Sequence, residues 1–106
     1  MKQIVAIVKP YLVEQVIKSI AEQPIEEINI REVKGFGRQK NYLERYGENE
    51  YSLVFVPKVE ISIWANDEHV NEIVNQITQV SRTGRLGDGK ILVLPVISLS
   101  SPSAVG

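Results

Sequence analysis

The chain has 106 residues, no cysteine and one histidine, and its formal net charge is −1. This length suits one domain with one modest core, and the composition, 43% hydrophobic and 24% charged, is that of an ordinary soluble globular protein. These numbers exclude disulfides, thiolate metal sites and a histidine-rich metal site within one chain, and they do not indicate a general affinity for nucleic acid or anionic membranes.

The segment QIVAIVK, at 3–9, is a short apolar run rich in β-branched residues and predicts a buried strand. Lys9-Pro10 stops this run well short of the ~18–20 residues of a membrane span. It also lacks the longer core and small-residue cleavage site of a signal peptide. We therefore expect a cytoplasmic protein.

Pro10 opens a predicted helix, which Pro24 closes. Its apolar residues fall on one helical face: Leu12, Val13, Val16, Ile17 and Ile20. Residues 25–34 then alternate between apolar and polar and predict a half-buried strand. Residues 35–51 contain many charges and no sustained period, so we predict a long loop. Loops longer than ~12–15 residues in compact domains tend to be functional.

The strand pattern resumes at 53–65, with one face formed by Val59, Ile61, Ile63 and Ala65. Asn66 and Asp67 are candidates to cap a second helix, whose apolar stripe is Val70, Ile73, Val74 and Ile77. KILVLPVISL, at 90–99, predicts the last strand, and we expect the final residues, 97–106, to form a flexible tail.

The resulting order is β-α-β-loop-β-α-β, which predicts one α+β domain over residues 1–106. Its expected fold is ferredoxin-like, βαββαβ, with an antiparallel sheet and two helices on one face. The other face would leave Val5, Ile7 and Trp64 exposed. An exposed apolar face on so small a domain indicates oligomerisation.

The segment Gly84–Lys90 contains a glycine, four residues and then Gly-Lys, as in a phosphate-binding P-loop. A P-loop lies between a strand and a helix, whereas this segment follows a helix and precedes a strand. Ile91 also stands where a Mg²⁺-binding Ser or Thr is required. Two interpretations remain: a glycine-rich turn whose N–H groups and Lys90 bind an anion, or a tight turn with a solvated lysine.

Three segments, EVKGFGRQK (32–40), ERYGENEYSLVFVPK (44–58) and TGRLGDGKI (83–91), together resemble the PII signal-transduction proteins, or nitrogen regulatory proteins P-II. The resemblance runs from Met1 to about Val96. It implies a homotrimer that binds ATP or ADP in clefts between subunits, and 2-oxoglutarate through a Mg²⁺ ion held by ATP. It further implies a sensor, not an enzyme, that controls enzymes, transporters or transcription regulators of nitrogen metabolism. Contact with a membrane would arise only through a transporter target.

The resemblance assigns roles to individual residues. Tyr51 lies where some members are uridylylated, although it could simply be an aromatic residue that enters a strand. Residues 37–55 would be the loop that docks on a target protein. Gln39 would help to coordinate Mg²⁺, and Lys58 would pair with a 2-oxoglutarate carboxylate. The expected nucleotide-binding residues are Asn29, Gly35, Gly37, Arg38, Ser62, Trp64, Gly87, Asp88, Gly89 and Lys90.

The sequence also departs from the family pattern. No lysine or arginine follows Lys90, and Ser101 and Ser103 replace two arginines that clamp the nucleotide phosphates. Ser62 stands where a glutamate is usual. These changes support a second hypothesis: a diverged PII-like regulator with an altered preference between ATP and ADP, no 2-oxoglutarate binding, and a target outside nitrogen metabolism, for example in carbon or transport control.

Overall fold

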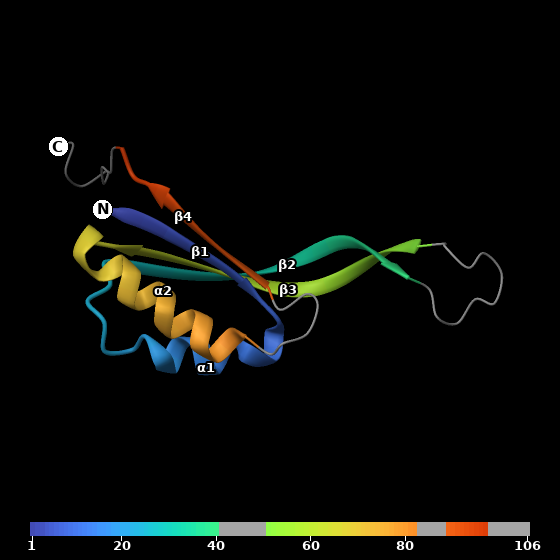
Figure 1. Ribbon diagram of the computed structural model, residues 1–106, viewed down its shortest axis with the longest axis horizontal. Helices are drawn as coiled ribbons and strands as arrows, with labels where there is room; N and C mark the ends of the chain where they lie inside the picture. The colour runs from blue at the N-terminus through green and yellow to red at the C-terminus, as the bar shows by residue number, and fades with distance from the viewer. Residues whose placement is uncertain (41–50, 83–88, 98–106) are drawn as a thin grey trace.

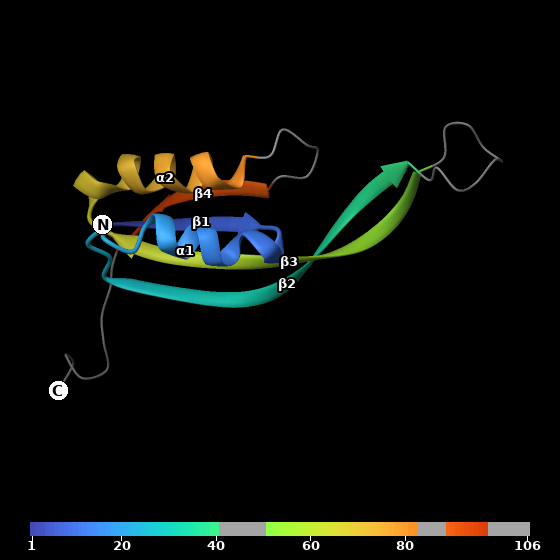
Figure 2. The ribbon, with the colours of Figure 1, turned by 90° about the horizontal axis from the view of Figure 1, so that it is seen from below.

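The computed structural model describes residues 1–40, 51–82 and 89–97. It confirms the ferredoxin-like α+β arrangement: one antiparallel four-stranded sheet, in the strand order β2-β3-β1-β4, carries both helices on one face (Figures 1 and 2). The elements are β1 (Lys2–Val8), a short 3-10 helix (Pro10–Leu12), α1 (Val13–Ser19), β2 (Glu27–Lys40), β3 (Tyr51–Ala65), α2 (Asp67–Ser81) and β4 (Gly89–Pro95).

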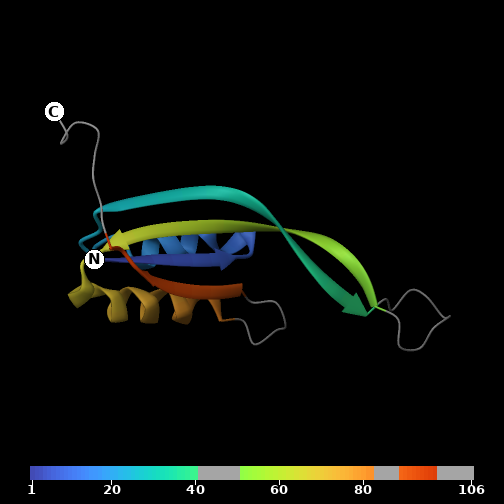
Figure 3. The same cartoon turned by 90° about the horizontal axis from the view of Figure 1, so that it is seen from above.

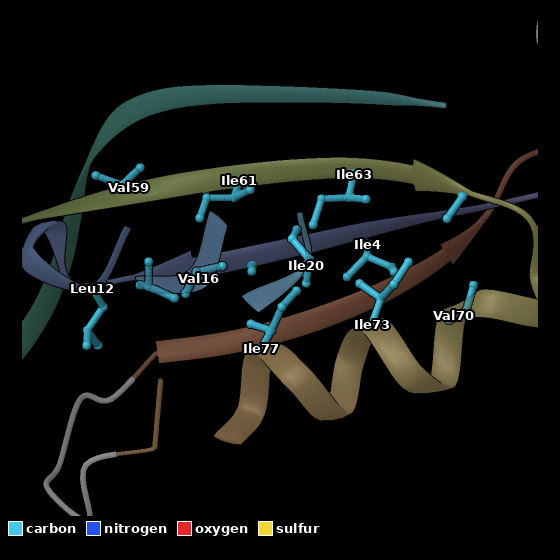
Figure 4. Close-up of a cluster of buried hydrophobic side chains, with 13 residues drawn as sticks. Ile4, Leu12, Val16, Ile20, Val59, Ile61, Ile63, Val70, Ile73 and Ile77 are labelled. Atoms are coloured by element: carbon cyan, nitrogen blue, oxygen red, sulfur yellow. The ribbon is translucent and has the colours of Figure 1, made fainter. Parts of the chain in front are cut away.

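The core lies between the helices and the sheet, and it contains the apolar faces predicted from the sequence (Figure 4). Alternate residues of β1 and β3 point into it, because side chains of a strand alternate between the two faces of its sheet. The largest fully buried side chains are Ile4, Val8, Val16, Ile20, Ile61, Ile63, Ile73 and Ile77. Val74, which belongs to the predicted stripe of α2, is only partly buried.

Ile63 and Ile28 form a matched pair for testing this core, because they lie opposite each other on β3 and β2. Ile63 is fully buried, whereas Ile28 on the edge strand is 39% exposed. We expect Ile63→Ala to lower the free energy of unfolding by about 2–5 kcal/mol through lost burial and a cavity. Ile28→Ala should cost about 1 kcal/mol. Urea unfolding measures both, and equal losses would contradict the packing described here.

The prediction of a loop over residues 35–51 is wrong at both of its ends. Residues 35–40 belong to β2 and pair with 51–56 of β3, as far as Lys40 opposite Tyr51. The pairing of β1 with β3 ends at Val8 opposite Val59. Beyond that point β2 and β3 pair only with each other and extend away from the sheet as a two-stranded arm (Figure 3). Residues 41–50 lie outside the described parts of the chain.

The first helix is shorter than predicted. It ends at Ser19, not near Pro24. The chain leaves it through tight turns, in which the N–H groups of Ile20, Ala21 and Gln23 each donate to the carbonyl three residues earlier. The Ser19 hydroxyl also donates to the carbonyl of Val16 at 2.7 Å. These shorter turns use the backbone groups that a longer α-helix would have paired.

The second helix begins where the sequence places it, with Asn66 at the N-cap in an extended conformation. The Asn66 side chain makes no capping hydrogen bond. Asp67 instead accepts from the amino nitrogen of Met1, with its Oδ1 2.9 Å away. This hydrogen bond lowers the pKa of the Asp67 carboxyl below its ordinary value. No helix within the described ranges is both long and apolar enough to cross a membrane.

The exposed apolar surface lies mainly at the edges of the sheet, which corrects the expectation for Val5. Val5 is only 8% exposed, because it lies on a central strand between Ser62 of β3 and Leu92 of β4. Ile7 and Trp64 are half-buried. The large exposed apolar side chains of the strands are instead Ile28 and Ile30 on β2 and Leu92, Val93 and Leu94 on β4.

Candidate functional site

Asn29, Ser62 and Trp64, all predicted to bind a nucleotide, line one pocket on the helix-free face of the sheet. Asn29 lies opposite Ser62, and Trp64 follows on the same face of β3. This pocket, here named the sheet-face pocket, has a volume of about 370 Å³. Its lining is Gln3, Asn29, Arg31, Glu60, Ser62 and Trp64. It combines an aromatic ring with polar and charged side chains.

An ion pair that the sequence analysis did not identify lies in the same pocket. Arg31 and Glu60 face each other across β2 and β3. The Glu60 Oε2 atom is 2.7 Å from the Arg31 Nε atom and 2.6 Å from Nη2. The Glu60 side chain is only 17% exposed, and that of Arg31 is 73% exposed. Strand alternation in the sequence indicated that Arg31 shares a face of β2 with Asn29, and Glu60 a face of β3 with Ser62. Only the register of the two strands shows that Arg31 and Glu60 meet.

Gly89 and Lys90 belong to the glycine-rich turn that was predicted to bind an anion, here named the phosphate turn. They line a second pocket of about 290 Å³ where α2 ends and β4 begins. We name it the strand-end pocket, and its lining is Val8, Thr78, Ser81, Arg82, Gly89, Lys90 and Ile91. Arg82 was not predicted to take part. It contributes a second cation, and no carboxylate belongs to the described lining, so this pocket favours an anion.

The hydroxyl groups in the strand-end pocket are already used within α2. Thr78 donates to the carbonyl of Val74 at 2.8 Å, and Ser81 donates to the carbonyl of Ile77. Because each hydroxyl has a single hydrogen to donate, neither is free to donate to an anion in this arrangement. Arg82, Lys90 and backbone N–H groups are therefore the donors that this pocket offers.

Gly89 has a backbone conformation that requires glycine. Its φ is +127°, and a Cβ atom at this position would lie within 3.0 Å of the carbonyl oxygen of Ile7. That oxygen belongs to the backbone of β1, which pairs with β4 here. The absence of a side chain thus allows the phosphate turn to enter the sheet directly against β1.

Gly35 and Lys58, predicted to belong to the nucleotide cleft and the 2-oxoglutarate site, are neighbours. A Cβ atom on Gly35 would lie 3.3 Å from the Lys58 Cγ atom, so the aliphatic part of Lys58 lies beside the bare backbone of β2. Lys58 also shares the helix-free face with Glu60 and Ser62. This contact fixes where the lysine stem runs at the base of the arm.

For the remaining predicted residues, either only the position of the backbone is described or the residue lies outside the described ranges. Gly37, Arg38 and Gln39 belong to the arm, opposite residues 54, 53 and 52 of β3. Tyr51 begins β3. The phosphate-turn residues Gly87 and Asp88 and residues 98–106 of the predicted tail are not described. Ile97, the first residue of that tail, is almost fully exposed. Within the described segments, no group of three or more His, Asp or Glu side chains could hold a metal ion.

The two pockets share no lining residue. Val8 and Ile91 of the strand-end pocket belong to the helix-covered face, whereas the sheet-face pocket lies on the other face. Lys90 connects the two regions, because register places it in one row across the sheet with Ile7, Glu60 and Arg31. Three strand spacings, about 14 Å, separate Arg31 from Lys90 in that row. One chain therefore does not gather all predicted nucleotide-binding residues into a single cleft.

Comparison with known proteins agrees with the resemblance in the sequence. Residues 1–101 match the family described as "Nitrogen regulatory protein P-II". Proteins of that name from Azospirillum brasilense and Klebsiella oxytoca are each 45% identical over 96 residues, which cover 91% of this chain and 86% of the relative. Nitrogen regulatory protein P-II 1 from Escherichia coli K12 matches with the same identity and coverage.

Proposed function

The chain belongs to the nitrogen regulatory protein P-II family of signal-transduction regulators, and from this premise we propose that it senses ATP and ADP. In this proposal 2-oxoglutarate binds together with Mg-ATP, and the signal reaches a target in nitrogen metabolism through the β2–β3 arm. The observation that carries the proposal is the grouping of the predicted residues into a polar, aromatic pocket and a separate cationic pocket.

The charges of the two pockets suit the two ends of a nucleotide. The sheet-face pocket contains one cation and one carboxylate that neutralise each other, so it suits an uncharged base better than a phosphate. The strand-end pocket carries Arg82 and Lys90 and suits phosphates. Because the pockets lie on different faces, a neighbouring subunit would complete each nucleotide site. This supports binding in clefts between subunits.

The edges of the sheet support association into a trimer. Both outer strands, β2 and β4, expose large apolar side chains, and each pairs on one side only with another described strand. Such edges tend to associate with other strands, and a second copy would cover them. Light scattering at micromolar concentration measures the mass that this proposal requires, three times that of the 11.9 kDa chain.

The arm is the element proposed to dock on a target, which would be an enzyme, a transporter or a transcription regulator. Its paired strands extend beyond every other strand of the sheet (Figure 3), so a partner could approach it without contacting the core. Tyr51 lies in the outermost described pair of the arm, opposite Lys40. Uridylylation of Tyr51 stays a prediction. Because the family consists of regulators, we propose that the chain catalyses no reaction.

Mg²⁺ and 2-oxoglutarate would bind near the base of the arm. Lys58 lies beside Gly35 there, and a lysine ammonium suits a carboxylate as a compact charge. Gln39 would contribute an amide oxygen to Mg²⁺, which prefers oxygen ligands. Its backbone lies on β2 opposite Ser52, two pairs beyond Gly37 on the same strand.

A diverged regulator is the second candidate. The tail lacks cations after Lys90, and each missing charge-assisted contact to phosphate removes roughly 1.5–3 kcal/mol. Arg82 in the strand-end pocket offers one replacement. If it contacts only part of a triphosphate, the preference between ATP and ADP would differ from that of relatives with tail arginines.

Calorimetric titration distinguishes the two candidates. ATP and ADP are titrated separately with Mg²⁺, with and without 2-oxoglutarate. We expect 2-oxoglutarate to bind only when Mg-ATP is present. Nucleotide binding without any 2-oxoglutarate binding, or an outright preference for ADP, would support the diverged regulator. Absence of any nucleotide binding at millimolar concentration would contradict both.

A further inference from the structure

The Arg31–Glu60 pair leaves part of the Glu60 carboxylate available to a ligand. Both short contacts from Arg31, at 2.7 and 2.6 Å, reach the same oxygen, Oε2. Among the described residues none donates to the other oxygen, Oε1, so it can accept a hydrogen bond from a ligand. Because the Glu60 side chain is 17% exposed and Arg31 holds it across the strands, this acceptor is fixed in position within the sheet-face pocket.

The rest of the pocket suits a flat, uncharged, hydrogen-bonding group. Trp64 offers an aromatic ring for stacking. Asn29 and Gln3 offer amides, and Ser62, which is 8% exposed, offers a hydroxyl. The charges of Arg31 and Glu60 cancel, so neither a phosphate nor a free cation gains from entering. A nucleobase matches this combination of a flat ring and polar edges.

We propose that Glu60, positioned by Arg31, determines base specificity by accepting a hydrogen bond from the exocyclic amino group of adenine. The proposal rests on the nucleotide-binding function proposed above and adds the residue that distinguishes bases. Hypoxanthine carries a carbonyl oxygen where adenine carries this amino group. That oxygen would face the Glu60 carboxylate without a hydrogen to share, so the pocket would reject it.

The alternative is a purely structural ion pair. Pairs with one well-exposed partner stabilise proteins little, and Arg31–Glu60 would then serve only to hold β2 against β3. The two roles differ in what they change. A structural pair alters folding stability and affects all nucleotides equally, whereas a base-reading carboxylate alters the ratio of affinities between two nucleotides that differ at one substituent.

The test is calorimetric titration of ATP, ITP and 2′-deoxy-ATP into the full chain and its variants. For the unsubstituted protein we expect ATP to bind roughly tenfold or more tightly than ITP, as for a hydrogen bond to a charged group. Glu60→Ala should reduce this ratio to about twofold or less. The double variant Arg31→Ala/Glu60→Ala should do the same without leaving an unpaired arginine. Glu32→Ala, an exposed carboxylate change on the opposite face of β2, should keep the original ratio.

Several results would overturn the inference. One is equal binding of ATP and ITP by the unsubstituted protein. Another is an ATP-to-ITP affinity ratio that stays unchanged in both Glu60 variants. A third is that the variants lose discrimination against 2′-deoxy-ATP but keep it against ITP, which would assign Glu60 to the ribose. In each case nucleotide binding itself persists. If the unsubstituted protein binds no nucleotide, the proposed function fails, and this inference fails with it.

Discussion

Gly89→Ala is expected to destabilise the fold more than any other glycine-to-alanine change among the described residues. At φ +127° an alanine is strained, which by itself costs about 1–3 kcal/mol. The new Cβ atom would also lie within 3.0 Å of the Ile7 carbonyl oxygen, a backbone atom that cannot move independently of β1. This clash can be relieved only if β4 shifts away from β1, so the pairing of Val8 with Gly89 should be lost.

Gly35→Ala provides the matched control for this prediction. A Cβ atom there would lie 3.3 Å from the Lys58 Cγ atom and 3.3 Å from the Val56 carbonyl oxygen. Both neighbours need to move by only a few tenths of an ångström, and Gly35 does not have a positive φ, so the expected cost is below about 1 kcal/mol. Urea unfolding of both variants measures the difference. Equal stability losses in the two variants would contradict the special conformation assigned to Gly89.

Lys90→Ala is expected to weaken ATP binding by roughly ten- to a hundredfold, the effect of losing one charge-assisted contact of about 1.5–3 kcal/mol. Lys90 is exposed and its side chain belongs to no core cluster, so the fold and the subunit assembly should persist. The loss should be largest for ATP, smaller for ADP and absent for adenosine, which has no phosphate. Calorimetric titration of the three ligands measures this dependence.

Lys18→Ala is a suitable control for the loss of a positive charge. Lys18 lies on α1, exposed and paired with Glu14 at 3.1 Å, and it lines neither pocket. Its removal should leave ATP affinity unchanged. Unaltered ATP affinity in Lys90→Ala would exclude the phosphate role, and an equal loss with adenosine would show that the substitution acts through the fold instead.

The elements that pack on the core were the ones that the sequence predicted well. The apolar stripes of α1 and α2 and the alternation of β1 and β3 appear in the sequence because one face of each element is buried. The boundaries of α1 were less predictable. Pro24 marks a position that a helix cannot pass, but the tight turns after Ser19 end it earlier.

The β2 side of the arm was missed for a related reason, whereas the strand predicted from residue 53 includes most of its β3 side. A strand is visible in a sequence when one of its faces packs on a core and its residues alternate accordingly. Residues 35–40 and 51–56 lie beyond the end of β1 and are held by pairing between β2 and β3. Backbone hydrogen bonds place no requirement on residue type, so the glycines and charged residues of 35–40 suggested a loop.

The sequence by itself determined the order of the elements, the residues of the core and, through its three motifs, the family and the candidate site residues. Only the tertiary structure decided which distant residues meet: Arg31 with Glu60, Arg82 with Gly89 and Lys90 in the strand-end pocket, and Gly89 with the carbonyl of Ile7. The physical reason is register. Local patterns report whether a residue faces a core, whereas its cross-strand partner depends on how the strands align, and a shift of one residue would change every such contact.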